Sequence, residues 1–263
     1  MTNVPRFDAR ILGLVALLAT LGLASCGATP RRFFGNAFYA PVFSYRVRFI
    51  RHARPPLLLS RSWLLDNWHR TADGPVAMKF GDSVSFSLDA NNDGRYETTV
   101  TEPRSDLRFL HREDGSSIWL RGVPLSWTLR DRALGVIAHD YVDRIAGGNY
   151  FDVSFGTTIE AHEEHWGTRI VEEGPATTGG EPAWVAVFDI LSLEQRQVSS
   201  AHVGDRVEIA FFRPGRHTWQ PENYSGSASW PVVVVAGYAA RGEIFAAHRA
   251  EFEALLGRID VLP

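Results

Sequence analysis

The sequence predicts an α+β fold in which a mainly antiparallel β-sheet packs against two amphipathic helices, at about residues 129–146 and 243–258. Several stretches alternate apolar and polar residues, as half-buried strands do, and only two stretches repeat apolar residues with the period of a helix. Turn-forming Gly, Asn and Asp separate the strands. Many strands with only two helices between them favour antiparallel pairing. A composition of 45% hydrophobic and 22% charged residues suits one domain with a proper core.

The N-terminus carries an uncharged apolar run, residues 11–24, directly after Arg6 and Arg10. Its roughly fourteen residues suit the apolar part of a signal peptide and fall short of the about twenty needed to span a bilayer. The run ends in Leu23, Ala24, Ser25 and Cys26. These four residues match the bacterial lipobox at each position, so the chain resembles a lipoprotein precursor with residues 1–25 as its signal peptide. An uncleaved helical anchor, or a cysteine there by chance, is the alternative.

The resemblance implies a modification of Cys26. In lipoproteins this cysteine receives a diacylglyceryl thioether and, after cleavage before it, an acyl chain such as palmitate on its amine. At about 0.8 kcal/mol per buried CH₂, two or three such chains hold a protein durably on a membrane. We therefore expect an exported protein, lipid-anchored in the cell envelope. Gly27 stands where an Asp would retain an enterobacterial lipoprotein in the inner membrane, which points to the outer membrane.

Cys26 is also the only cysteine in the chain. If it is acylated, the protein can form no disulfide and offers no thiolate to a metal. Its stability must then come from a packed core. The net charge of −3 gives no reason to expect nucleic acid as a partner.

The mature chain divides into a flexible, lipid-anchored tether, residues 26–41, and one globular α+β domain, residues 42–263. A basic and aromatic stretch, residues 31–61, contains no acidic residue and could lie along an anionic bilayer surface. The alternative is a strand, because apolar and polar residues alternate from Val42 on. The alternating apolar residues are Phe43, Tyr45, Val47 and Phe49. We favour the strand from Val42.

Two predicted strands, residues 83–88 and 96–102, flank a loop that resembles the calcium loop of EF-hand and dockerin-type sites. The candidate calcium ligands are Asp89, Asn91, Asp93 and Glu97. Alternate carboxylate and amide oxygens around the bend at Gly94 suit Ca²⁺. Val100 stands where an EF-hand has its bidentate Glu, and the flanks are strands instead of helices. The alternative is a polar hairpin turn without metal.

The segment before the first of these strands ends in Gly81, Asp82 and Ser83, which resembles the nucleophile block of the GDS-type lipases and esterases. That family supplies its base from a later Asp-x-x-His. Here the matching pair, Asp66 and His69, comes before Ser83 and thus in the wrong chain order. A turn that starts a strand explains these residues better.

The second half begins with a predicted hairpin, residues 107–110 and 117–120 around a turn at Asp114 and Gly115. The first helix follows, with Thr128 and Asp131 as its capping pair. Its apolar face comprises Leu134, Ile137, Ala138, Tyr141, Val142 and Ile145. On the opposite face lie His139 and Asp140, which we expect to be solvated.

A strand at residues 150–155 precedes His162 and His165. Zincin histidines stand at i and i+4, whereas these stand at i and i+3 with no third ligand in sight. An exposed charged turn is therefore the better interpretation. Strands are predicted at 168–172, 184–190 and 206–212, the first two joined at Gly179 and Gly180.

A long loop, residues 214–229, holds Trp219 and Tyr224, which either form a binding surface or pack back onto the sheet. A continuous β-branched run, residues 232–235, predicts a buried strand. The second helix carries an apolar stripe with His248 at its margin. The stripe comprises Ile244, Phe245, Phe252, Leu255, Leu256 and Ile259.

From Leu107 on, the order of elements resembles the PsbP-like α/β sandwich, so residues 104–263 are the PsbP-like part and residues 42–103 a β-rich extension. The resemblance implies an accessory or binding module. We therefore expect a lipid-anchored envelope protein without catalytic activity, which binds the membrane through Cys26 and an envelope protein as partner. The alternative is an envelope hydrolase or metal-dependent enzyme that uses Ser83, or His162 and His165.

Overall fold

The computed structural model describes residues 31–34, 36–50, 59–70, 76–78, 83–88, 98–103, 105–146, 167–191, 205–215, 218–220 and 229–262. All strand pairs in these ranges are antiparallel, and two α-helices accompany them. The predicted α+β class is therefore confirmed. Neither helix has the combined length and apolarity that would let it cross a bilayer, within the part of the chain described.

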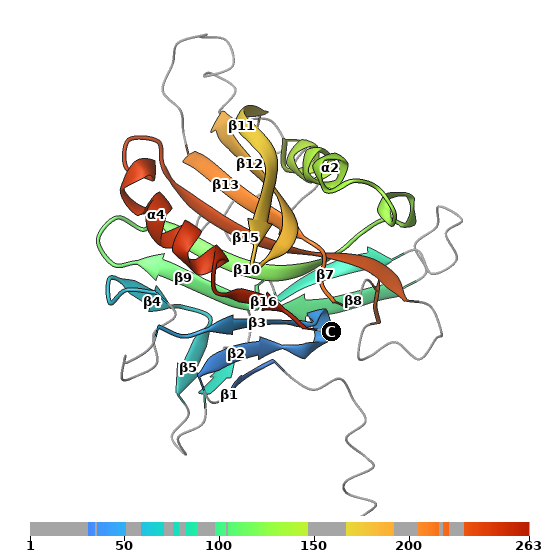
Figure 1. Ribbon diagram of the computed structural model, residues 1–263, viewed down its shortest axis with the longest axis horizontal. Helices are drawn as coiled ribbons and strands as arrows, with labels where there is room; N and C mark the ends of the chain where they lie inside the picture. Colours follow the sequence, from blue (N-terminus) through green and yellow to red (C-terminus); the bar gives the residue numbers. More distant parts are fainter. Residues whose placement is uncertain are drawn as a thin grey trace, which may run out of the picture.

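One large sheet forms the centre of the molecule (Figure 1). Its strands, in spatial order, are β11 (Gly167–Thr178), β12 (Glu181–Leu191), β13 (Asp205–Phe212), β15 (Trp230–Arg241), β10 (Ser117–Pro124), β9 (Leu107–His111) and β4 (Trp63–Leu65). A short strand, β14 (Thr218–Trp219), pairs with the start of β15. Trp219 is buried beside Phe43 and Trp230, so this aromatic residue of the long loop packs onto the sheet.

Strand β15 is buried on both faces, which explains its continuous β-branched sequence. Val233 and Val235 join one hydrophobic cluster, whereas Val232 and Val234 join the other. The strand predicted at residues 232–235 is thus confirmed within a longer element. The large sheet therefore separates two cores.

Helix α2 (Leu134–Ala146) covers one face and packs against β11, β12 and β13 (Figure 1). Four residues of its predicted apolar face are buried, namely Ile137, Ala138, Tyr141 and Val142. The ring of Tyr141 lies edge-on to Phe211 at 5.3 Å. The helix starts later than the predicted residue 129, because a separate 3₁₀ turn, η2 (Trp127–Leu129), precedes it. Ser126 caps that turn by accepting a 3.4 Å hydrogen bond from the Thr128 N–H. Thr128 therefore does not cap the helix, contrary to the prediction.

A second, four-stranded sheet and helix α4 (Phe245–Leu256) cover the other face. The sheet comprises β1 (Arg32–Phe34), β2 (Ala37–Ala40), β3 (Tyr45–Arg48) and β16 (Ile259–Val261), with a 3₁₀ turn, η1 (Pro41–Phe43), between β2 and β3. Tyr45 and Val47 are fully buried, which confirms the strand expected in this stretch. Its first residues, Val42 and Phe43, instead lie in the turn η1.

Two predictions fail in this part of the molecule. Residues 32–40 were expected in a flexible tether, but they form β1 and β2, with Ala37, Phe38 and Ala40 buried. They are ordered because Phe38 packs into the core beside Trp68. Ile259 was expected in the helical stripe, but α4 ends at Leu256 and Ile259 lies in β16 opposite Val47.

Two short hairpins complete the described fold. Strand β5 (Trp68–Arg70) pairs with β6 (Val76–Met78), and β7 (Ser83–Leu88) pairs with β8 (Thr98–Pro103). The strands expected on either side of the Asp/Asn loop are thus confirmed. The predicted turns are confirmed as well, with positive φ at Gly115, Gly179 and Gly180, a conformation that glycine adopts without steric cost.

Candidate metal centre

Most of the site residues predicted from sequence lie outside the described ranges. These are Cys26, the loop residues Asp89, Asn91, Asp93 and Glu97, and the pair His162 and His165. The strand predicted at residues 150–155 lies outside them too. Ser83 is the first residue of β7 and stands opposite Pro103.

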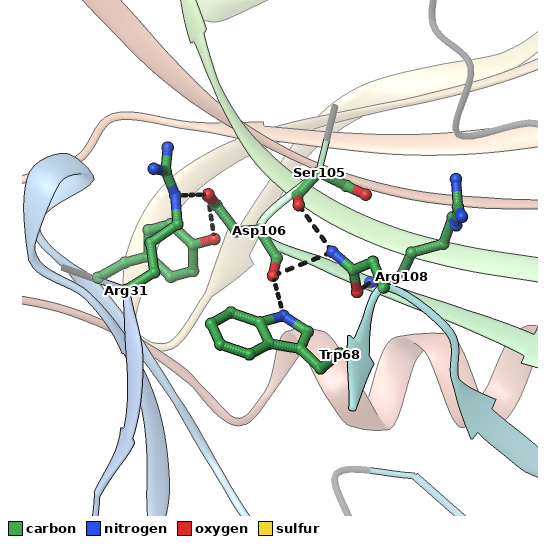
Figure 2. Close-up of polar contacts among 7 residues, drawn as sticks. Arg31, Trp68, Ser105, Asp106 and Arg108 are labelled. Atoms are coloured by element: carbon green, nitrogen blue, oxygen red, sulfur yellow. Dashed lines mark hydrogen bonds and ion pairs between the residues drawn. The ribbon is translucent and has the colours of Figure 1, made fainter. Parts of the chain in front are cut away.

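The most buried charge at the junction of the two sheets is Asp106, which is 1% exposed (Figure 2). The hydroxyl of Tyr45 donates a 2.6 Å hydrogen bond to its Oδ2, and the Arg31 guanidinium pairs with its Oδ1. Burial, followed by the charge of Asp106, raises the pKa of Tyr45 well above its usual value. Asp106 directly precedes strand β9, so these contacts connect the N-terminal segment to the start of β9.

The backbone around Asp106 is held by two more side chains (Figure 2). Trp68 Nε1 donates to the Asp106 carbonyl at 2.7 Å, and Asn67 Nδ2 donates to the Ser105 carbonyl at 2.8 Å. Asn67 Oδ1 in turn accepts from the Arg108 N–H at 2.8 Å. These donors and acceptors pair with one another, so the network stabilises the junction of β4, β5 and β9.

A second buried carboxylate, Asp189, lies in a row across three strands. Arg169 on β11 and Arg206 on β13 stand directly opposite Asp189 on β12. Their guanidinium groups lie 2.8 Å and 2.7 Å from its two oxygens. Burial alone would raise the pKa of Asp189, but the hydrogen bonds and charges of the two arginines outweigh it and lower the pKa. This row stabilises the edge of the large sheet.

A third cluster has the chemistry of a metal centre. It forms where α4 passes the end of the β9–β10 hairpin, and it comprises His111, Asp114 and His248. One ligand atom from each residue lies within 4.8 Å of the other two. Asp114 Oδ2 is 3.1 Å from His111 Nδ1 and 2.8 Å from His248 Nε2. The imidazole centroids of His111 and His248 are 4.1 Å apart.

The hairpin turn fixes the Asp114 carboxylate. Its Oδ1 accepts a 2.8 Å hydrogen bond from the Ser116 N–H, which leaves Oδ2 directed to the two histidines. Burial would raise the pKa of Asp114, but hydrogen bonds from Ser116 and His248 and the charge of His111 lower it to about 2. Asp114 is therefore an anion at neutral pH, ready to balance a positive charge.

Helix α4 fixes His248. Its Nδ1 lies 3.4 Å from Glu251 Oε2, one helical turn further on, and Trp63 Nε1 donates to the same oxygen at 2.8 Å. Burial would raise the pKa of Glu251, but hydrogen bonds from Ser60, Trp63 and His248 lower it. These contacts run from Trp63 through Glu251 and His248 to Asp114. They fix the position of both ring nitrogens of His248.

Sequence reasoning expected His248 at the margin of the core and missed the cluster. His248 does pack at that margin, with its ring edge-on to Trp63 at 5.6 Å. Two local signals were present: His111 and Asp114 stand three apart around a turn, as do His248 and Glu251 on a helix. Of the pair expected to be solvated, His139 has a side chain that is 51% exposed and contacts Glu173, whereas Asp140 is half-buried.

A pocket of about 550 Å³ lies elsewhere, between the start of α2, the start of β12 and the C-terminal β16. Leu134, Pro182 and Val261 contribute to its wall, beside Arg213. Arg213 Nη1 and Nη2 donate to the carbonyls of Arg130 and Arg132 at 3.1 and 2.6 Å. Arg213 therefore braces the segment that leads into α2.

No protein-family model matches the sequence. No curated protein matches it either. Among solved structures, the fold is similar to a PsbP from the cyanobacterium Synechocystis, at a TM-score of 0.38 and 10% identity, covering 77% of this chain and 94% of that one. It is also similar to LpqN, involved in cell envelope biogenesis of Mycobacterium tuberculosis, at a TM-score of 0.31 and 9% identity, covering 70% and 87%. A PsbP structure is thus among the matches.

Proposed function

We propose that this protein is a lipid-anchored accessory or binding module of the bacterial cell envelope, held on the outer membrane through Cys26. The observation that carries the proposal is the position of the first residues that the structure describes, relative to the lipobox. Strand β1 starts at Arg32, and Arg31 already pairs with the buried Asp106. From Cys26 to Arg31 is five residues, a reach of at most about 18 Å.

So short a connection would keep the four-stranded sheet at the membrane surface. Strand β1 is one of the two edge strands of that sheet. Phe34 is 67% exposed there, and the guanidinium of Arg32 lies 5.7 Å from the centre of its ring. Aromatic rings favour the bilayer interface, and arginines are attracted to anionic headgroups. These side chains support an orientation with β1 toward the lipid.

Two buried carboxylates of the described domain support a structural or binding role. Asp106 and Asp189 are each paired with cationic or hydroxyl groups of the protein itself, which suits a stable scaffold. The alternative class, an envelope hydrolase or metal-dependent enzyme, depends on Ser83 or on His162 and His165. Alanine at each of these positions separates the two classes, because a binding module would keep its full cellular activity in all three variants.

The anchor is tested by fractionation of the cell envelope. The wild-type chain is expected in the outer membrane, and Cys26→Ser is expected to accumulate as the uncleaved precursor. Asp114→Ala, which leaves the lipobox unchanged, is the control and should fractionate as the wild type does. A Cys26→Ser protein that is still cleaved and still membrane-bound would contradict the proposal. Cross-linking of the wild-type protein in intact cells, followed by detergent extraction, then identifies the partner.

A further inference from the structure

We propose that His111, Asp114 and His248 bind a divalent transition-metal ion of the zinc type. One donor atom from each residue lies within 4.8 Å of the other two, and Asp114 Oδ2 is 3.1 Å from His111 Nδ1 and 2.8 Å from His248 Nε2. Tetrahedral zinc with bonds of about 2.0–2.1 Å places neighbouring ligand atoms about 3.3 Å apart. The two distances from Asp114 are therefore a few tenths of an ångström short of this spacing, so small side-chain movements would admit the ion.

The kinds of donor atom select the class of metal. Two imidazole nitrogens and one carboxylate oxygen are ligands that Zn²⁺ and similar transition metals take in proteins. Ca²⁺ and Mg²⁺ instead need several oxygen ligands. Three protein ligands also leave one tetrahedral position for water or an external group. The anionic Asp114 would offset part of the charge of the metal.

His111 provides an independent reason to place an ion there. His111 is 7% exposed, and its Nδ1 is a buried polar atom without a hydrogen-bond partner among the described residues. Nδ1 lies close to Asp114 Oδ2, but the geometry does not make a hydrogen bond. A buried polar atom without a partner is unfavourable. A metal ion between His111 and Asp114 would give that nitrogen its partner.

The surroundings of His248 also match a metal centre. In metal sites the second ring nitrogen of a ligating histidine usually donates to a carboxylate, which fixes the tautomer and the ring orientation. Here Nδ1 of His248 faces Glu251 Oε2 at 3.4 Å, and Trp63 Nε1 donates to the same oxygen at 2.8 Å. Glu251 therefore takes the role of an outer partner, and His248 Nε2 remains the donor toward the ion.

The competing interpretation needs no metal. A protonated His248 could bridge the carboxylates of Asp114 and Glu251 as an ion-pair network. That arrangement leaves the buried Nδ1 of His111 without a hydrogen bond, whereas the metal site accounts for His111 and His248 together. The difference between the two interpretations is measurable as zinc affinity.

The test is a titration of the chelator-stripped full chain, purified in detergent, with Zn²⁺ alone. We expect one tightly bound ion per chain, together with a melting temperature that rises with Zn²⁺ and falls again on chelation. His111→Ala and His248→Ala should weaken that binding more than the loss of an outer partner does. Glu251→Gln, which removes the outer partner, should weaken it by about tenfold or more.

His139→Ala is the matched control. His139 also faces a carboxylate, with Nε2 at 2.6 Å from Glu173 Oε2, but it lies on the exposed side of α2. It should bind Zn²⁺ as the wild type does. If His111→Ala does not fold, His248→Ala and Glu251→Gln decide the matter, because both side chains are only partly buried. Unchanged zinc affinity in the folded variants, or no zinc binding by the wild type, would overturn the proposal.

Discussion

Asp106 shows how one buried charge can determine the attachment of a whole sheet. Its carboxylate accepts from Tyr45 and pairs with Arg31, and both partners belong to the N-terminal segment. Asp106→Ala should lower the free energy of unfolding by about 3 kcal/mol, because it removes the carboxylate that pairs with a buried hydroxyl and a largely buried guanidinium. Tyr45→Phe removes one hydrogen bond and should cost about 1 kcal/mol. Urea unfolding measures both, and equal costs for the two variants would contradict this account.

Asp189 makes stability depend on pH in a defined direction. Arg206 and Arg169 hold its pKa below the usual value in the folded state. The ionised form therefore stabilises the fold fully above the unfolded-state pKa of about 4, and this contribution is lost as the pH falls below it. Asp189→Asn should remove that part of the acid sensitivity. Unfolding curves at neutral pH and near pH 3 test this. A loss of stability between the two pH values that is as large in Asp189→Asn as in the wild type would count against it.

At the scale of residues, sequence patterns predicted burial better than they predicted polar partners. The apolar face of α2 follows from periodicity alone, since every third or fourth residue meets the sheet. The polar clusters do not, because their members are far apart in the chain: Arg31 and Asp106 are 75 positions apart, and His248 and Asp114 are 134 apart. A lone Asp or His in a sequence gives no sign of which distant side chain it will meet.

The hairpin of β7 and β8 is the element on which the calcium prediction depends. Leu88 pairs with Thr98, so the two ends of the Asp/Asn loop are held side by side. If the loop binds Ca²⁺, millimolar calcium should raise the melting temperature, and Asp93→Ala should remove the effect. Asn92→Ala changes the loop position between two candidate ligands and serves as the control. A melting temperature that calcium does not move would rule out the site.

Element boundaries were predicted well where a local pattern determines them. The Gly179–Gly180 turn and the alternation in β3 are of this kind. The start of α2 was wrong because Ser126, Thr128 and Asp131 offer competing caps, and the structure uses Ser126 for a 3₁₀ turn. Residues 32–40 were assigned to a tether because a basic, aromatic stretch suits both a membrane surface and an edge strand. The burial of Phe38 decided between them.

For the molecule as a whole, the class of fold was predictable and the arrangement was not. Many strands and two helices indicate an antiparallel sheet with helices on it. The order of the strands depends on contacts between distant segments, such as the pairing of the C-terminal β16 with β3. That pairing closes the small sheet beside the large one and brings the two ends of the described chain into one layer (Figure 1).

The central claim is that the mature protein begins at a lipid-modified Cys26. Mass spectrometry of the N-terminal tryptic peptide, residues 26–31, from protein purified out of host membranes tests it most directly. The account predicts a peptide that starts at Cys26 and carries the mass of a diacylglyceryl group and an acyl chain, with residues 1–25 absent from the mature protein. A peptide that continues upstream of Cys26, or an unmodified Cys26 thiol, would contradict it.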